Sequence, residues 1–120
     1  MGIRVLVVED SQLISGALRI LLEANGYEVS VAGTAIDAVE TAAALPPSVV
    51  LLDLTLPDED GLWVLGELES RGVHPSVKLA MSGYDDATTR ERCIAAGCDD
   101  LLVKPVPVRE ILRIIAERTS

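Results

Sequence analysis

Five short apolar runs alternate with longer segments of helical spacing, and this alternation restricts the fold more than any other feature of the sequence. The first and third runs consist almost entirely of valine, leucine and isoleucine, as expected for parallel strands that are covered on both faces. The second run alternates apolar and polar residues, which is typical of a strand at the edge of a sheet. The runs occupy residues 3–8, 27–32, 48–53, 77–82 and 101–104.

Each run is followed by a segment with the apolar spacing of a helix. Thr34 is expected to cap the second helix, and Gly26 and Gly97 to end the first and the fourth. Five β-α repeats in 120 residues predict one α/β domain, residues 1–120, with helices on both faces of a five-stranded parallel sheet. We expect the flavodoxin-like, doubly wound (βα)5 fold with strand order 2-1-3-4-5. The predicted helices span residues 11–24, 34–44, 62–70, 86–96 and 108–118.

Charge and composition exclude several classes of protein. The net charge is −9 and the ten basic residues form no run, which argues against direct nucleic-acid binding by this domain. No apolar run approaches the roughly 18 residues that span a bilayer, and the N-terminus lacks a secretory signal pattern. We therefore expect a cytoplasmic protein without membrane association. Cys93 and Cys98 are expected to be reduced thiols rather than metal ligands.

Polar side chains stand at the ends of four of the five apolar runs. The carboxyl ends of parallel strands share one edge of the sheet, and neighbouring strands lie about 4.8 Å apart, so these side chains should gather in one pocket. Three carboxylates at such distances repel one another unless a cation binds, and Mg²⁺ prefers oxygen ligands of this kind. The residues are Glu9, Asp10, Asp53, Ser82 and Lys104.

A metal ion, a lysine and a hydroxyl around Asp53 would form a receptacle for a phosphoryl group. Asp53 is then the candidate nucleophile, which forms an acyl phosphate. Taken singly, each of these residues also has an ordinary interpretation, Glu9 and Asp10 as helix-capping acids and the others as turn or loop residues. Their coincidence at four strand ends favours the phosphoryl site.

The segments VLVVED, VVLLDLTLPDEDG, MSG and GCDDLLVKP follow one another in the order and spacing of a known family. From Ile3 to about Arg118 the chain resembles the receiver domain of bacterial two-component response regulators. The resemblance implies a signalling domain, rather than a separate enzyme, whose Asp53 accepts a phosphoryl group from a sensor histidine kinase or a phosphotransfer protein. It also implies that the domain assists its own phosphorylation and dephosphorylation.

The resemblance extends to the magnesium ligands. Asp10 matches a direct ligand of Mg²⁺, and Glu9 matches an acidic partner that acts through water. Asp53 and the backbone carbonyl of Thr55 are implied as further ligands.

The resemblance assigns two roles on the later strands. Ser82 matches a switch hydroxyl that moves to bind a phosphoryl oxygen. Lys104 matches the lysine that pairs with the phosphoryl group, and the Lys104-Pro105 bond is implied to be cis, which X-Pro bonds permit.

Two positions depart from the family pattern. Leu101 stands where the family often has an aromatic switch residue, and Val106 stands where it often has phenylalanine. Tyr84, two residues beyond Ser82, is expected to substitute in part as a switch. We expect the signal to leave through the face of the fourth helix, fifth strand and fifth helix, which would form a phosphorylation-dependent homodimer. The charged residues expected there are Arg90, Arg92, Asp99, Asp100, Glu110 and Arg113.

The first predicted helix has more apolar residues than one buried face needs. Leu13, Ala17, Ile20 and Leu21 are expected to face the sheet. Ile14 and Leu18 then lie beside this stripe, near the polar edge, where they are candidates for docking a helical hairpin of the kinase. The alternative is that both residues add to the core against the fifth helix.

Three other functions compete with phosphoryl acceptance. A receiver-like interaction module that works without phosphorylation would usually lack an acid or the lysine. A Mg²⁺-dependent phosphatase with an aspartyl nucleophile resembles DxDx[TV], but Thr55 stands at its second aspartate. A flavin-binding fold should show a Ser/Thr/Gly-rich loop where this chain reads EDSQL. The sequence leaves open whether the domain stands alone or belongs to a larger protein.

Overall fold

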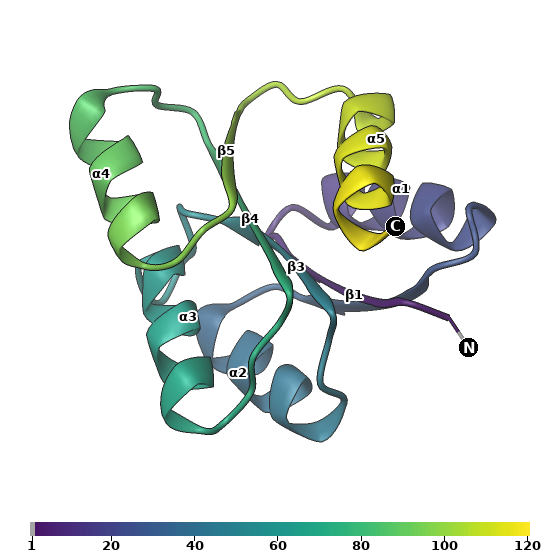
Figure 1. Cartoon of the computed structure of the whole chain (residues 1–120), viewed down its shortest axis with the longest axis horizontal. Coiled ribbons are helices and arrows are strands. Elements are labelled where there is room, and N and C mark those ends of the chain that lie inside the picture. Colours follow the sequence, from purple (N-terminus) through teal and green to yellow (C-terminus); the bar gives the residue numbers. More distant parts are fainter. Residues whose placement is uncertain (1) are drawn as a thin grey trace.

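The computed structural model describes residues 2–120 and contains five strands and five helices in strict alternation (Figure 1). The strands form one parallel sheet in the order β2-β1-β3-β4-β5, as predicted. The strands are β1 Arg4–Val8, β2 Glu28–Ala32, β3 Val49–Asp53, β4 Val77–Ser82 and β5 Asp100–Val103. The helices are α1 Gln12–Ala24, α2 Ala35–Ala44, α3 Gly61–Ser70, α4 Ala87–Ala95 and α5 Val108–Thr119.

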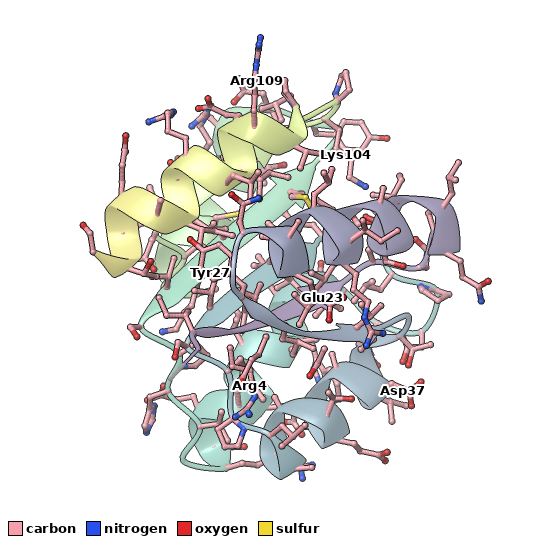
Figure 2. The ribbon with its side chains drawn as sticks, turned by 90° about the vertical axis from the view of Figure 1, so that its right-hand side faces the viewer. Arg4, Glu23, Tyr27, Asp37, Lys104 and Arg109 are labelled. Carbon is pink, nitrogen blue, oxygen red and sulfur yellow. The ribbon has the colours of Figure 1, made fainter. Side chains whose placement is uncertain are left out.

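The helices cover both faces of the sheet, as Figure 1 shows. Alternate residues of β1 and β3 point to opposite faces, which divides the core into two layers. One layer joins the sheet to α1 and α5, and the other joins it to α2 and α3. A third, smaller cluster of Ala80, Cys93 and Leu101 holds α4 against the sheet. Figure 2, turned by 90°, shows α5 and α1 side by side over the first layer.

Local sequence signals set the helix ends. Thr34 caps α2 as predicted, its hydroxyl accepting a hydrogen bond from the amide of Asp37. Gly26 follows the end of α1 with a φ of 89°, a left-handed conformation that glycine adopts at low cost. α3 begins one residue earlier than predicted, at Gly61, because Asp60 caps it. β5 ends at Val103, so Lys104 lies just beyond the strand, and the Lys104-Pro105 bond is cis as the resemblance implied.

The predicted orientation of α1 is wrong. Leu18 and Leu22 are buried with 2% and 0% of their surface exposed, whereas Leu13 is 85% and Ile20 is 68% exposed. Both sets of residues repeat at helical spacing, so periodicity alone does not choose between them. The position of the helix on the sheet buries the set that contains Leu18 and exposes the set that contains Leu13.

No helix in the described part of the chain is long and apolar enough to cross a membrane.

Candidate functional site

Three carboxylates gather at the carboxyl edge of the sheet, as predicted. The register pairs Val8 of β1 with Leu52 of β3, so Glu9 and Asp53 are the next residues on two adjacent strands. Glu9, Asp10 and Asp53 each offer an oxygen atom, and these atoms lie within 4.8 Å of one another. Glu9 and Asp53 are buried and Asp10 is exposed, so the cluster has one open side.

Burial and mutual repulsion make the charged form of these carboxylates less favourable. Burial raises the pKa of Glu9, and the nearby charge of Asp53 raises it further. The amide of Ser11, which donates to Glu9 Oε1 at 3.2 Å, and the charge of Lys104 both act in the opposite direction. A hard cation bound to these oxygens would relieve the remaining repulsion, so the donor set fits Mg²⁺.

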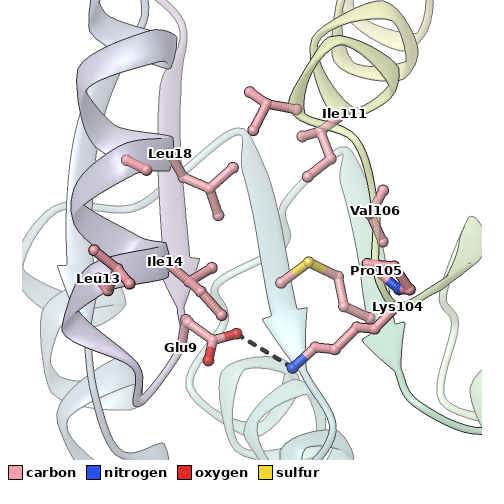
Figure 3. Close-up of a pocket in the computed structure, with 11 residues that line it drawn as sticks. Glu9, Leu13, Ile14, Leu18, Lys104, Pro105, Val106 and Ile111 are labelled. Atoms are coloured by element: carbon pink, nitrogen blue, oxygen red, sulfur yellow. Dashed lines mark hydrogen bonds and ion pairs between the residues drawn. The ribbon is translucent and has the colours of Figure 1, made fainter.

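Lys104 follows β5, which is separated from β3 by β4, and its side chain reaches the acidic cluster. Its Nζ lies 2.9 Å from Asp53 Oδ2 and 3.5 Å from Glu9 Oε2, the second contact being drawn in Figure 3. Burial acts to lower the pKa of Lys104, but the hydrogen bond and charge of Asp53, together with Glu9, raise it on balance. Lys104 therefore stays a cation that is fixed beside Asp53.

The second oxygen of Asp53 is held by its own loop. The amide of Thr55 donates to Asp53 Oδ1 at 3.0 Å. Thr55 in turn forms an isolated antiparallel bridge with Asp60, which closes the loop between β3 and α3. The carboxylate thus has one oxygen on Lys104 and the other on Thr55, an arrangement that fixes its plane.

Ser82 lies at the end of β4 but does not join this cluster. It is buried, and its hydroxyl accepts a hydrogen bond from the amide of Tyr84 at 3.0 Å. The backbone amide of Lys104 donates to the carbonyl of Ser82 at 2.8 Å, but within residues 2–120 no hydrogen bond joins the Ser82 hydroxyl to Asp53 or to Lys104. Met81, not Ser82, is the register partner of Asp53. Because successive side chains of a strand point to opposite faces, the side chains of Ser82 and Asp53 leave the sheet on opposite faces. The hydroxyl would have to turn to reach a group on Asp53.

The other predicted switch residues lie apart from the cluster. Leu101 is buried against Ala80 and Cys93 in the small core beneath α4. Tyr84 is exposed.

The charged residues predicted for a dimer face are largely paired within the chain. Arg90 pairs with Asp85, and Arg113 pairs with Glu110 and Glu117. Arg118 reaches Asp100 at 3.6 Å. All of these pairs are exposed, so each adds little stability.

A cavity of about 550 Å³ adjoins the cluster between α1 and the start of α5 (Figure 3). Glu9 and Lys104 line its polar end, and the rest of its wall is apolar. Of the two predicted docking residues, Ile14 lines this cavity and is 45% exposed. Leu18 also lines it, but its burial makes it a core residue, so its prediction as a docking residue is wrong. The error arises because the face of α1 predicted to contact the sheet is the exposed one. That face brings Leu13 to the cavity rim.

Sequence reasoning missed two residues between β3 and the first turn of α3: Asp58 in the loop and Gly61 at the start of the helix. Gly61 packs so closely on the end of β3 that a Cβ atom there would clash with the carbonyl oxygen of Asp53. Asp58 accepts hydrogen bonds from two amides of α2. The N-cap pattern before α3 could have located Asp60, but Asp58 has its partners more than twenty residues away, and local sequence carries no signal for such a contact.

Comparisons with known proteins identify relatives of this chain. A family model described as the response regulator receiver domain matches residues 5–116. The transcriptional regulatory protein KdpE of Mycobacterium tuberculosis is 42% identical over 108 residues, which are 90% of this chain and 47% of that protein. The response regulator MprA of a Mycobacterium species is 36% identical over 123 residues, covering 100% of this chain and 53% of that protein. The chain thus spans about half the length of the curated relatives that it matches.

Solved structures show the same fold. A CheY-like response regulator receiver domain from Methanospirillum hungatei superposes with a TM-score of 0.89 at 29% identity, covering 98% of this chain and 94% of that one. The receiver domain of a sensor histidine kinase from Pseudomonas aeruginosa gives a TM-score of 0.83 at 29% identity, with full coverage of both chains. That structure has a magnesium ion coordinated in its active-site cleft.

Proposed function

The chain belongs to the response regulator receiver domain family, and from this premise we propose that Asp53 accepts a phosphoryl group from a sensor histidine kinase or a phosphotransfer protein. The observation that carries the proposal is the buried Asp53 carboxylate, held by Lys104 and Thr55 beside two further acids. An aspartate in this position is oriented, lies close to a fixed cation, and adjoins Asp10 on the exposed side of the cluster.

In the proposed reaction an oxygen of Asp53 attacks the phosphorus of a phosphohistidine. The P–O bond forms as the P–N bond breaks, and the electron pair of that bond stays on the imidazole nitrogen, which takes a proton. Lys104 is already 2.9 Å from Asp53 and neutralises the negative charge that builds up on the phosphoryl oxygens. The same groups would serve the later hydrolysis, in which a water oxygen attacks the phosphorus, the P–O bond to Asp53 breaks and inorganic phosphate leaves.

Mg²⁺ would be held directly by Asp10, Asp53 and the carbonyl of Thr55, and through water by Glu9. When bound, the ion supplies positive charge against the phosphoryl oxygens. The proposal rests on the 4.8 Å cluster of oxygen donors and on the magnesium ion in the related Pseudomonas aeruginosa domain.

Ser82 would carry the signal away from Asp53. Its hydroxyl leaves the amide of Tyr84 and donates to a phosphoryl oxygen, which pulls on the loop that leads into α4. The face formed by α4, β5 and α5 then changes shape and favours a homodimer. Leu101 stays packed beneath α4, so the movement is expected without rotation of an aromatic ring at that position.

The donor protein would dock on α1 and the neighbouring cavity. Ile14 and Leu13 are exposed at the end of α1 that adjoins Glu9, so they can contact a protein that delivers its phosphohistidine to Asp53. An amphipathic helix of the donor suits such an apolar groove.

The test is the intact mass after incubation with Mg²⁺ and acetyl phosphate. The unsubstituted chain should gain one phosphoryl group and Asp53→Asn should gain none. Asp85→Asn, which removes an exposed carboxylate that pairs with Arg90 and makes no ion pair with Lys104, is the matched control and should behave as the unsubstituted chain. No gain in any of them would contradict the proposal and favour an interaction module that works without phosphorylation.

A further inference from the structure

The amino end of α2 is capped by a residue from another part of the chain. Asp58, in the β3–α3 loop, accepts hydrogen bonds from the amides of Ala35 at 2.8 Å and Ile36 at 3.1 Å, one on each carboxylate oxygen. Thr34 accepts from the next amide, that of Asp37. The first three amides of α2, which have no partner inside the helix, are all satisfied in this way.

The contact between Asp58 and α2 crosses over the end of β1, the strand that is followed by Glu9 and Asp10. α2 follows β2 and the Asp58 loop follows β3, and β1 lies between these strands in the sheet. β1 ends at Val8, directly before Glu9 and Asp10. Asp58 therefore ties together the two connections that flank the acidic end of β1.

Backbone contacts join the loop that carries Asp58 to the end of β3, so the position of Asp58 affects that of Asp53. The Thr55–Asp60 bridge closes the loop, and the amide of Gly61 donates to the carbonyl of Leu54 at 3.0 Å. The absence of a side chain at Gly61 lets its backbone lie against that of Asp53. A loop closed this tightly moves as one piece, so a shift at residue 58 reaches Thr55.

The charge of Asp58 suits this role. The hydrogen bond from the amide of Ala35, followed by that from Ile36, holds the pKa of Asp58 below its usual range, so the carboxylate is ionised at neutral pH. A negative group at a helix amino terminus also interacts favourably with the helix dipole.

We propose that Asp58 is a positioning residue for the cation site: by fixing the β3–α3 loop to α2, it holds the amide of Thr55 on Asp53 and the carbonyl of Thr55 available to the ion. The inference rests on the proposed function, because it assumes that Mg²⁺ binds at Asp10 and Asp53. Asp58 itself does not touch the ion. It acts through the backbone of Thr55.

The experiment is a Mg²⁺ titration of the whole chain, followed by the NMR shifts of the backbone amides of residues 53–55. Asp58→Ala should weaken Mg²⁺ binding by about tenfold, the lower end of the range for residues that orient metal ligands. Glu59→Ala is the matched control, because it removes the same charge from the neighbouring exposed position of the same loop. Its affinity should stay within about twofold of the unsubstituted chain, as expected for an exposed charge in salt.

Two further measurements separate positioning from a merely structural role. Asp58→Asn keeps one oxygen, which can accept from the Ala35 amide, but its NH2 group cannot accept from the Ile36 amide, so this variant should recover only part of the lost affinity. Hydrogen exchange of the Ala35 and Ile36 amides should be faster in Asp58→Ala, whereas in Asp58→Asn the Ala35 amide should exchange at a near-normal rate and the Ile36 amide faster.

The outcomes are distinguishable. Equal Mg²⁺ affinity of folded Asp58→Ala and Glu59→Ala would overturn the positioning role and leave the proposed function intact. No response of the unsubstituted chain to Mg²⁺ would overturn the cation site and the positioning role together.

Discussion

Helices α1 and α4 stand on opposite sides of the sheet and are anchored very differently. α1 buries Leu18 and Leu22 in the largest core layer and still exposes Leu13 and Ile20 on its outer side. Within α4, all of which lies in the described part of the chain, Cys93 is the single buried residue. One helix combines a firm anchor with an apolar exterior, and the other combines a weak anchor with a mostly polar exterior.

This difference matches two tasks that a receiver domain must separate. A surface that docks a donor protein should keep its shape, because ordering it on binding would cost affinity. A surface that responds to phosphorylation should change shape at low cost, and elements with few buried contacts open most easily. We therefore propose that the donor protein docks on α1 and that α4 responds to phosphorylation, and three predictions test that contrast.

The largest expected effect is on folding stability. Leu22→Ala should lower the free energy of unfolding by about 3 kcal/mol, because it leaves a cavity in the main core. Cys93→Ala should cost only about 1 kcal/mol, since its cluster is small and its side chain loses a single sulfur. Urea unfolding monitored by circular dichroism measures both values. Equal losses would show that α4 is anchored as firmly as α1.

The next effect is on phosphotransfer from a protein donor. Leu13→Ser should slow phosphotransfer by about tenfold, because it removes an exposed apolar contact at the cavity rim of the proposed docking surface. Ile94→Ser makes the same kind of change on α4, where Ile94 is 75% exposed, and should leave the rate unchanged.

Acetyl phosphate supplies the control for this second prediction. It needs no docking surface, so both variants should react with it as the unsubstituted chain does. Equal slowing by the two serine variants with the protein donor would remove the assignment of docking to α1.

The smallest effect concerns the pH dependence of the α4 anchor. Burial, and then the neighbouring Cys93, raise the pKa of Cys98 to about 12, above the value of an exposed thiol. The stability that comes from keeping this thiol neutral is complete below about pH 9 and is lost as the pH rises toward 12, because the unfolded chain ionises first.

Urea unfolding at pH 8 and pH 10 measures this loss, which should be about 1 kcal/mol at pH 10. Between pH 8 and pH 10, the free energy of unfolding of Cys98→Ser should fall by about 1 kcal/mol less than that of the unsubstituted chain. That of Leu22→Ala should fall by as much as in the unsubstituted chain. Identical pH profiles for Cys98→Ser and the unsubstituted chain would show that Cys98 is not held neutral beneath α4.

Part of the candidate site could be predicted from the sequence, and the reason is visible at Asp53. Parallel strands all end at one edge, so the residue that ends each apolar run must lie near the residues that end the others. Glu9, Asp10, Asp53 and Lys104 meet as expected for this reason. Ser82 follows the same rule in sequence, but its hydroxyl turns to the amide of Tyr84, a choice that depends on the loop conformation.

The sequence by itself determined the class of fold, the strand order and the edge at which the chemistry gathers. The class of fold and the shared edge follow from the period of the apolar pattern and from the handedness of β-α-β connections. The strand order follows from five strands in 120 residues, which favour 2-1-3-4-5 over the larger dinucleotide-binding order. The tertiary structure alone decided which side of α1 is buried and that Asp58 caps α2. Leu13 and Leu18 are equally apolar, and the partners of Asp58 are distant in the chain, so only the packed arrangement selects one side of the helix and brings the carboxylate to its amides.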